Sequence, residues 1–142
     1  MNHRIERSAL IQRPAEVLFS LVDDVERYPE FLPWCAGARV VAIEGQSVIA
    51  SLEVARGGVR QRFTTRNERR APEEIRMQLV EGPFSRLEGA WRFRALAADA
   101  CKVELSLEFG FGGSLTRLAF EKVFSEVAGT MVDAFCRRAQ GR

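Results

Sequence analysis

Apolar residues near the start of the chain follow a helical period. They occur at positions 17, 18, 21, 22 and 25, which is the spacing of one face of an α-helix. Pro14 suits a first helical turn, where its missing N–H group is not needed, so a short amphipathic helix is predicted from Pro14 to about Asp24. We expect a strand over residues 3–11 before this helix. A second short helical turn is expected over residues 26–32, closed by Pro33.

From Gly37 onward the period changes to two. Five runs of alternating residues begin at Val48, Val59, Ile75, Leu87 and Val103. Turn sequences containing glycine, proline or aspartate separate these runs. Alternation of this kind is typical of half-buried strands, and short connections make consecutive strands antiparallel neighbours. The middle of the chain is therefore predicted to be a meander of about six strands with one apolar face.

The last segment returns to a helical period. Five apolar residues fall at steps of four, three, four and four: Phe120, Phe124, Val127, Met131 and Phe135. They form one stripe of a helix that is expected to begin after an N-cap at Ser114. Arg137 and Arg138 complement the dipole at its C-terminal end. Such a helix of about 25 residues would be about 37 Å long, so it needs a long apolar surface to pack on.

These elements predict an α+β fold in a single domain over residues 1–142. The sheet has to curve around the last helix because each buries its apolar side against the other. A curved sheet and a helix are hard to close-pack completely, so we expect a space between them. The two short helices near residues 14–32 would close one end of that space.

Composition argues against several classes of function. The net charge of +2 is too small to indicate a nucleic-acid-binding protein by itself, and no DNA partner is expected. The only histidine is His3, and Cys35, Cys101 and Cys136 are far apart in sequence, so neither a metal site nor a disulfide framework is expected. We find no N-terminal apolar run and no stretch near the roughly 20 apolar residues of a membrane span, which favours a cytoplasmic protein.

One stretch of unusual composition follows the first predicted helix. YPEFLPWC, residues 28–35, holds three aromatic rings, two prolines and a cysteine, with Glu30 as its only charge. Together with GPF at residues 82–84 and LEGAWRF at residues 87–93, it resembles the coenzyme Q-binding family, which includes bacterial ribosome association toxins. This family lies within the START-like, polyketide cyclase or Bet v 1-like, superfamily. EFGF at residues 108–111 and VDAFCRRA at residues 132–139 extend the resemblance over nearly the whole chain.

The resemblance implies a helix-grip fold and a non-enzymatic function. Members bind ubiquinone or a related polyprenyl lipid under the long helix and act as carriers that support respiratory electron transfer. Ubiquinone is then a bound ligand, no cofactor is required, and transient contact with the inner membrane surface is expected. As an alternative, some bacterial relatives block the joining of ribosomal subunits, which implies the large subunit as a partner.

For lipid binding, the expected contacts fall into three groups. Residues 28–35 would form a lid that touches the ligand through Phe31, Leu32 and Trp34. The large inward-facing strand residues are Phe63, Met77, Leu79, Trp91, Phe93, Phe109 and Phe111. The last helix contributes Phe124, Val127 and Met131. For any one of these residues ordinary core packing is the simpler explanation, so the argument for a cavity is collective. Gln61 and Thr65 also face inward, where either could meet a quinone carbonyl group or lie at a sheet edge.

For ribosome binding, the candidate contacts are arginines on the outward face of the sheet: Arg60, Arg62, Arg66, Arg92 and Arg94. Guanidinium groups there could meet ribosomal RNA or anionic lipid headgroups. Glutamates alternate with them on the same face, so a solvated surface of mixed charge is the competing interpretation.

No enzymatic site is predicted. Asp23 and Asp24 are expected at a helix end, and the cysteines have no histidine near them to activate a thiolate. Tyr28, the only tyrosine, could assist a cyclase-like reaction, which keeps an aromatase or cyclase as a third hypothesis. Residues 110–113 are interpreted as a hinge before the last helix, not as a phosphate-binding loop.

Overall fold

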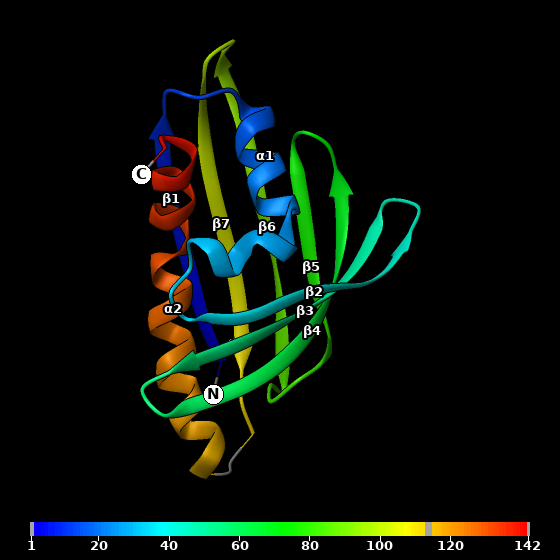
Figure 1. The fold of residues 1–142 in the computed structure, drawn as a ribbon, viewed down its shortest axis with the longest axis vertical. Coiled ribbons are helices and arrows are strands. Elements are labelled where there is room, and N and C mark those ends of the chain that lie inside the picture. Colours follow the sequence, from blue (N-terminus) through cyan, green and yellow to red (C-terminus); the bar gives the residue numbers. More distant parts are fainter. Residues whose placement is uncertain (1, 113–114, 142) are drawn as a thin grey trace.

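The computed structural model describes the backbone of residues 2–112 and 115–141. In these ranges the chain forms seven strands and three helical segments (Figure 1). Their order is β1 (Asn2–Ile11), α1 (Ala15–Asp23), the 3-10 helix η1 (Val25–Glu30), β2 (Cys35–Glu44), β3 (Ser47–Arg56), β4 (Val59–Arg70), β5 (Glu74–Glu81), β6 (Arg86–Ala97), β7 (Ala100–Gly110) and α2 (Leu115–Ala139). This order confirms the predicted α+β helix-grip fold.

The seven strands form one antiparallel sheet in the order β1-β7-β6-β5-β4-β3-β2. Consecutive strands from β2 to β7 are neighbours, as the short connections predicted, and β1 pairs with β7 at one edge. The sheet curves strongly: in Figure 1, β2, β3 and β4 run across the view, whereas β1, β7 and α2 run along it. Register shifts between Val40 and Ala42 and between Thr64 and Thr65 help the strands to bend.

Gly89 allows a close approach between strands in the middle of the sheet. It lies between Met77 of β5 and Leu107 of β7 in the strand register. A Cβ atom at this position would overlap the Ser106 carbonyl oxygen and come within 2.8 Å of the Leu107 side chain. No side chain fits here without a backbone shift, so glycine permits the local coiling of β6 against β7.

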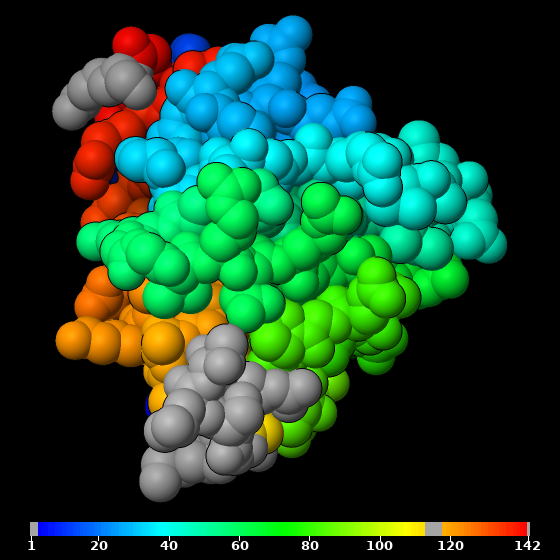
Figure 2. Space-filling view, turned by 60° about the horizontal axis from the view of Figure 1, so that its bottom comes forward, coloured from blue at the N-terminus to red at the C-terminus, as the bar shows by residue number. Residues whose placement is uncertain are grey.

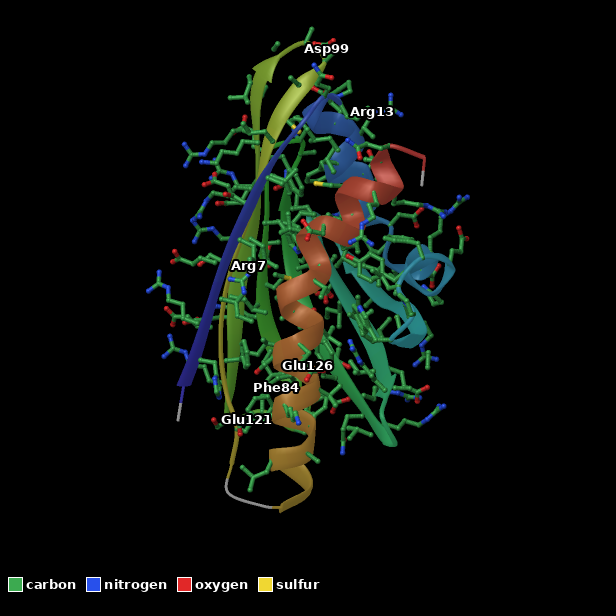
Figure 3. The ribbon with its side chains drawn as sticks, turned by 90° about the vertical axis from the view of Figure 1, so that its left-hand side faces the viewer. Arg7, Arg13, Phe84, Asp99, Glu121 and Glu126 are labelled. Carbon is green, nitrogen blue, oxygen red and sulfur yellow. The ribbon has the colours of Figure 1, made fainter. Side chains whose placement is uncertain are left out.

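Helix α2 has the predicted length of 25 residues and lies along the concave side of the sheet (Figures 1 and 3). Its predicted apolar stripe faces the sheet, where Phe120, Val127 and Phe135 have no exposed surface. The opposite side of the helix is exposed at Lys122 and Glu126. The long helix therefore supplies one wall of the interior.

Element boundaries differ slightly from the predicted ones. Pro14 is the N-cap of α1 and not its first helical residue. The 3-10 helix η1 ends two residues earlier than expected because the backbone leaves helical angles at Phe31, where φ is −138° and ψ is −2°. The predicted N-cap Ser114 lies outside the described residues, as does part of the predicted hinge at residues 110–113.

The interior has two regions along α2. Around the N-terminal half of the helix, six phenylalanines form what we call the aromatic cluster: Phe63, Phe84, Phe109, Phe111, Phe120 and Phe124. Most neighbouring ring centroids in it are 4.9 to 5.8 Å apart, which is the range of favourable edge-to-face packing. Phe84, labelled in Figure 3, lies beside the lower part of α2. The other region, toward η1, contains a cavity.

Candidate ligand-binding cavity

A largely enclosed cavity of about 60 Å³ lies between the sheet and α2, with η1 at one side. Strands β3 to β7 and the helices η1 and α2 all contribute to its wall. The lining residues are Val25, Tyr28, Trp34, Ala50, Leu52, Phe63, Thr65, Asn67, Met77, Leu87, Trp91, Leu105, Leu107, Phe124, Val127 and Met131. Apart from Tyr28, Thr65 and Asn67, these side chains are aliphatic, aromatic or thioether groups, so the wall suits an apolar guest.

The volume of the cavity limits the size of a ligand that can enter without a rearrangement of side chains. An engineered apolar cavity of about 150 Å³ binds benzene, which is more than twice the space available here. A quinone ring therefore needs side chains to move. Met77 and Met131 are both half-buried, and their unbranched, flexible side chains can change rotamer at small cost. Rotation of these two side chains can therefore enlarge the cavity.

The lid, residues 28–35, is held in place by hydrogen bonds to α1 and within itself. The Tyr28 hydroxyl donates to the Val22 carbonyl oxygen, and the Leu32 N–H group donates to the Tyr28 carbonyl oxygen at 2.9 Å. The Cys35 N–H group in turn donates to the Leu32 carbonyl oxygen at 2.9 Å. Burial, followed by the nearby Asp23 carboxylate, raises the pKa of the Tyr28 phenol well above its usual range. Tyr28 therefore keeps its proton and serves as a fixed donor within the lid.

A contact we call the clasp joins the lid to the end of α2. The Arg138 guanidinium lies over the Phe31 ring, 5.0 Å from its centroid, and its Nη2 atom is 2.6 Å from Glu30 Oε1. In the space-filling view, α1 and η1 in blue lie beside the C-terminal end of α2 in red (Figure 2). Outside the clasp, α1 and the lid form a mainly apolar groove of about 410 Å³ that includes Val17 and Leu21.

A chain of rings connects this groove to the cavity. Phe31 lines the groove, and its centroid lies 5.2 Å from that of Phe135, which is fully buried. Phe135 in turn packs against Tyr28 at 5.2 Å and Trp91 at 5.3 Å, and both of these rings line the cavity. Aromatic side chains, the outermost of which lies under Arg138 of the clasp, therefore separate this groove from the cavity.

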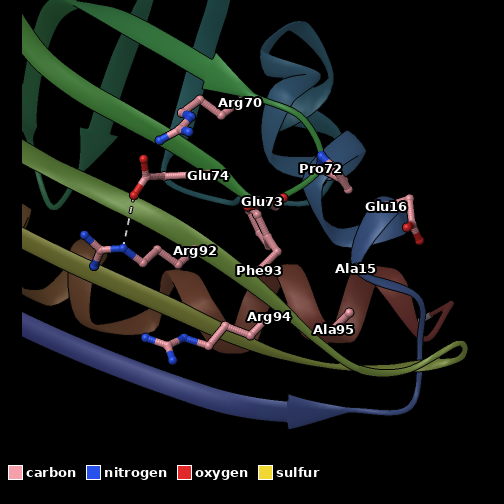
Figure 4. A pocket seen from close by; sticks show the side chains of 10 residues that line it. All are labelled: Ala15, Glu16, Arg70, Pro72, Glu73, Glu74, Arg92, Phe93, Arg94 and Ala95. Carbon is pink, nitrogen blue, oxygen red and sulfur yellow. Dashed lines mark hydrogen bonds and ion pairs between the residues drawn. The ribbon is translucent and has the colours of Figure 1, made fainter.

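The structure brings seven of the thirteen expected ligand contacts to the cavity wall: Trp34, Phe63, Met77, Trp91, Phe124, Val127 and Met131. The other six lie elsewhere. Phe109 and Phe111 pack in the aromatic cluster. Phe93 packs against Phe19 of α1, with ring centroids 5.8 Å apart, and lines an outer hollow (Figure 4).

The remaining three expected contacts also lie outside the cavity wall. Phe31 lies on the outer side of the lid beneath the clasp, and Leu32 is buried behind the cavity wall. Leu79 is half-buried further along β5 and does not reach the wall. Of the two inward polar residues, Thr65 lines the cavity and Gln61 does not.

Several wall residues were not among the expected contacts: Val25, Tyr28, Ala50, Leu52, Asn67, Leu87, Leu105 and Leu107. The signal for most of them was present, because Leu87, Leu105 and Leu107 follow the inward alternation already recognised. Asn67 continues the inward series of Phe63 and Thr65 by one further step along β4. Ala50 is small, so a search for large side chains passes over it.

The outward arginines are mostly paired with glutamates of other strands. Arg60 lies 2.8 Å from Glu53, Arg66 lies 3.8 Å from Glu44, and Arg94 lies 2.5 Å from Glu104, each between a guanidinium nitrogen and a carboxylate oxygen. These pairs make most of the face a surface of mixed charge. Arg62 is the exception among the five candidates: within the described residues it has no ion pair.

Glu74 lies in the wall of the outer hollow, which has a volume of about 540 Å³ and lies at the start of α1 (Figure 4). It is largely buried and accepts hydrogen bonds from Arg76 Nε at 2.9 Å and Arg92 Nε at 3.1 Å. The Arg76 hydrogen bond chiefly, with Arg92 adding to it, holds the pKa of the Glu74 carboxyl below its usual range. Arg70 and Arg94 extend on the same side of the sheet.

Two further features bear on function. In the part of the chain that the structure describes, no three His, Cys, Asp or Glu side chains are grouped as metal ligands. Within the same residues, no helix combines the length and hydropathy that crossing a bilayer requires.

A long helix held in a curved antiparallel sheet, over an apolar cavity, defines a helix-grip protein of the START-like, Bet v 1-like class. The chain belongs to the family described as polyketide cyclase / dehydrase and lipid transport, whose model matches residues 11–136. These findings confirm the class that the lid and LEGAWRF motifs indicated.

Comparison with individual proteins adds detail to this family assignment. It is similar to the ribosome association toxin RatA of Pseudomonas aeruginosa, with 48% identity over 140 residues that cover 99% of this chain and 97% of that protein. It is also similar to the mitochondrial coenzyme Q-binding protein COQ10 homolog B of Xenopus laevis, with 29% identity over 87% of this chain and 52% of that protein. The aromatase/cyclase ZhuI of Streptomyces sp. R1128 shares the fold, with a TM-score of 0.86 and 17% identity over 99% of this chain and 94% of that one.

Proposed function

We propose that the protein binds ubiquinone or a related polyprenyl lipid in the cavity under α2 and acts as its carrier or chaperone, in support of respiratory electron transfer. The observation that carries this proposal is the enclosed wall of apolar side chains, interrupted by three polar residues. Removal of apolar surface from water, worth about 25 cal/mol per Å², supplies the driving force. The proposed site of action is the cytoplasm, with transient contact at the inner membrane.

Loading of the ligand requires the cavity to open. We propose that the lid moves away from α2 when the clasp between Arg138, Phe31 and Glu30 releases. The contacts that break are an exposed ion pair and a cation–π contact, each worth about 1 kcal/mol or less. Rotation of Met77 and Met131 then widens the space inside. No cofactor and no bond-making step is needed for this function.

Trp34 and Trp91 provide a direct test, because they are the only two tryptophans and both line the cavity. Decylubiquinone added to the purified protein should quench their fluorescence in a saturable manner. Organic extraction of the native protein followed by mass spectrometry should recover a quinone or isoprenoid lipid. If saturating decylubiquinone causes no quenching and the extract contains no lipid, the lipid-carrier function is rejected.

A second candidate function is supported by the similarity to RatA, which spans nearly all of both chains. The protein would then block joining of the ribosomal subunits through a contact with the large subunit. The surface best suited to RNA is the outer side of β2 and β4, where Arg39 and Arg62 line one shallow hollow with Glu53. Within the described residues, neither arginine has an ion pair.

Sucrose gradients test the ribosomal candidate. Overproduction should reduce the assembled ribosome peak, and salt should release the protein from the large subunit. Replacing both Arg39 and Arg62 by glutamate should abolish the effect. Arg60→Glu is the matched control, because Arg60 is already paired with Glu53. An unchanged gradient on overproduction would remove this candidate.

An aromatase or cyclase activity has less support. The Tyr28 hydroxyl, the one candidate acid, is engaged by the Val22 carbonyl oxygen, and burial raises its pKa. A proton that is held in this way is not available for transfer at neutral pH. An aromatase or cyclase that uses Tyr28 would turn over an aromatic-forming substrate and lose that activity in Tyr28→Phe. We expect no turnover by the wild-type protein, and turnover that is lost in Tyr28→Phe would restore the enzymatic hypothesis.

A further inference from the structure

The cavity side of β4 changes from apolar to polar along its length. Its inward residues are Phe63, then Thr65, then Asn67, then Arg69. In the strand register Thr65 lies between Ala50 and Leu79, and the next inward residue, Asn67, lies one step closer to the end of the strand. Of this series, Phe63, Thr65 and Asn67 line the cavity. One strand therefore brings a polar edge to an otherwise apolar wall.

Most polar groups near this edge already have partners. Arg69 Nη1 lies 3.2 Å from Asp23 Oδ2, and its Nε donates to the Gln46 carbonyl oxygen at 3.3 Å. The Tyr28 hydroxyl donates to a backbone carbonyl oxygen of α1. The groups that face the cavity from η1 and β4 are thus largely committed to the fold.

The Asn67 amide is different. Thr65 Oγ1 donates to Asn67 Oδ1 at 2.8 Å, which uses the carbonyl end of the amide and fixes the orientation of the group. The Nδ2 end carries two hydrogens. Among the residues that the structure describes, no acceptor is bonded to Nδ2, and no buried side-chain nitrogen or oxygen there lacks a partner. Nδ2 therefore faces accessible space, not a closed apolar wall.

We propose that Asn67 is the residue that recognises the polar head of the ligand, through an N–H···O hydrogen bond from Nδ2 to a carbonyl oxygen. This assignment rests on the proposed lipid-binding function and makes it more specific. The guest has a ring carbonyl group, and that group lies at β4, while its apolar part faces Met77, Leu105 and Met131. Thr65 is a positioning residue, since its hydrogen bond to Oδ1 fixes the amide of this cavity-lining side chain.

The chemistry predicts discrimination between otherwise similar guests. A guest without an acceptor displaces water from Nδ2 and leaves the two N–H groups unpaired, which is unfavourable in an apolar site. A guest with a ring carbonyl group replaces that water at no such loss. Selectivity for ketones and quinones over hydrocarbons of the same shape should therefore depend on this one side chain.

Duroquinone and durene form a matched pair of probes, since both are six-membered carbon rings that carry four methyl groups. Equilibrium dialysis gives the dissociation constant of each for the wild-type protein and for Asn67→Leu. We expect Asn67→Leu to weaken duroquinone binding by about 3- to 10-fold and to leave durene binding unchanged or tighter. The ratio of the two changes in dissociation constant separates the contribution of the hydrogen bond from the effect of the substitution on packing.

Two further variants guard against a structural effect. Asn67→Asp keeps the shape and still accepts the hydrogen bond from Thr65, but it has no donor, so it should show the same selective loss for duroquinone. Thr65→Val should also weaken duroquinone more than durene, because the amide loses its fixed orientation. Equal changes for both probes in Asn67→Leu and Asn67→Asp would overturn the assignment. Failure of the wild-type protein to bind either probe would overturn the lipid-binding function along with it.

Discussion

The two regions of the interior under α2 are built from similar residues but have opposite character. In the aromatic cluster, Phe109 and Phe124 pack with centroids 4.9 Å apart, and the rings fill the space. Toward the lid, the cavity wall includes the small side chains of Ala50 on the sheet and Val127 on α2, which leave part of the space between sheet and helix unfilled. A period-two pattern of apolar residues thus produces a solid core or a cavity, depending on the size of the facing side chains.

The regions also differ in how they are held together. The aromatic cluster is held by ring packing, to which the stacked His3 ring adds, whereas the cavity region is closed by hydrogen bonds of the lid and by the clasp. Packing of deeply buried rings is expected to open less readily than contacts near the surface. Hydrogen bonds and an exposed ion pair can release locally, so opening of the lid leaves the other end of the molecule intact.

The largest expected effect comes from removing a ring from the aromatic cluster. Phe109 has no exposed surface, so Phe109→Ala should lower the free energy of unfolding by about 3–5 kcal/mol. Phe31→Ala is the matched control, because Phe31 is half-buried in the lid and should lose about 1–2 kcal/mol. Urea denaturation measures both values. Equal losses would mean that the cluster is no more important to stability than the lid.

Filling the cavity should separate binding from stability. Ala50 is buried at the cavity wall, and Ala50→Leu places a larger side chain in the space. We expect more than tenfold weaker decylubiquinone binding, with a change in unfolding free energy of about 1 kcal/mol or less. Ala90→Leu adds the same atoms on the outer face of the sheet and should leave binding unchanged. Unaltered affinity in Ala50→Leu would place the ligand elsewhere.

Alkaline pH should weaken the lid region. Burial raises the pKa of the Tyr28 phenol and raises that of the Cys35 thiol to about 11. The folded protein therefore keeps protons that the unfolded chain loses above about pH 8.5 for cysteine and about pH 10 for tyrosine. The stability contributed by these groups is complete below those values and falls as pH rises, by up to about 1.4 kcal/mol per unit for each group.

Tyr28→Phe checks the origin of this alkaline loss. It removes the phenol that titrates, so above about pH 10 the unfolding free energy should fall less steeply than in the wild-type protein. At pH 7 the same variant should be about 1 kcal/mol less stable, because the Val22 carbonyl oxygen loses its partner. Urea denaturation at pH 7, 9 and 11 gives both quantities. Parallel pH curves for the two proteins would exclude Tyr28 as the cause.

The smallest effect is expected at the clasp. Arg138→Gln removes the ion pair with Glu30 and the contact over Phe31, and it should cost about 0.5–1 kcal/mol of stability. Stopped-flow fluorescence should show decylubiquinone entering and leaving a few-fold faster. Arg137→Gln is the control, since Arg137 is exposed on the adjacent position of α2. Equal exchange rates in the two variants would mean that the clasp does not limit access.

Much of the fold follows from the sequence because periods and turn residues are local signals. The helical stripe from Phe120 to Phe135 predicted both the length of α2 and its buried face. Period-two alternation also identified the inward side of strands β3 to β7. The alternation did not reveal which of the two interior regions an inward residue belongs to. For that reason Phe109 was grouped with Trp91, although Phe109 lies in the aromatic cluster and Trp91 lines the cavity.

The polar edge of the cavity was harder to foresee. Asn67 follows Arg66 in a run of polar and charged residues, which is typical of an exposed strand end. It lines the cavity because the curved sheet brings the end of β4 under η1, and this curvature depends on register shifts such as the one at Thr64. The sequence patterns predicted that the sheet curves around α2, but they do not give the place at which each strand bends.

The position of Arg138 has a practical side for anyone who labels this protein. The lid meets the C-terminal end of α2, whereas β1 begins toward the opposite end of the molecule (Figure 1). A fluorescent protein or affinity peptide fused behind α2 would crowd Phe31 and Glu30 and could prop the entrance open or seal it. A fusion before β1 lies away from the lid and the clasp, so it is the better choice for localisation or uptake assays.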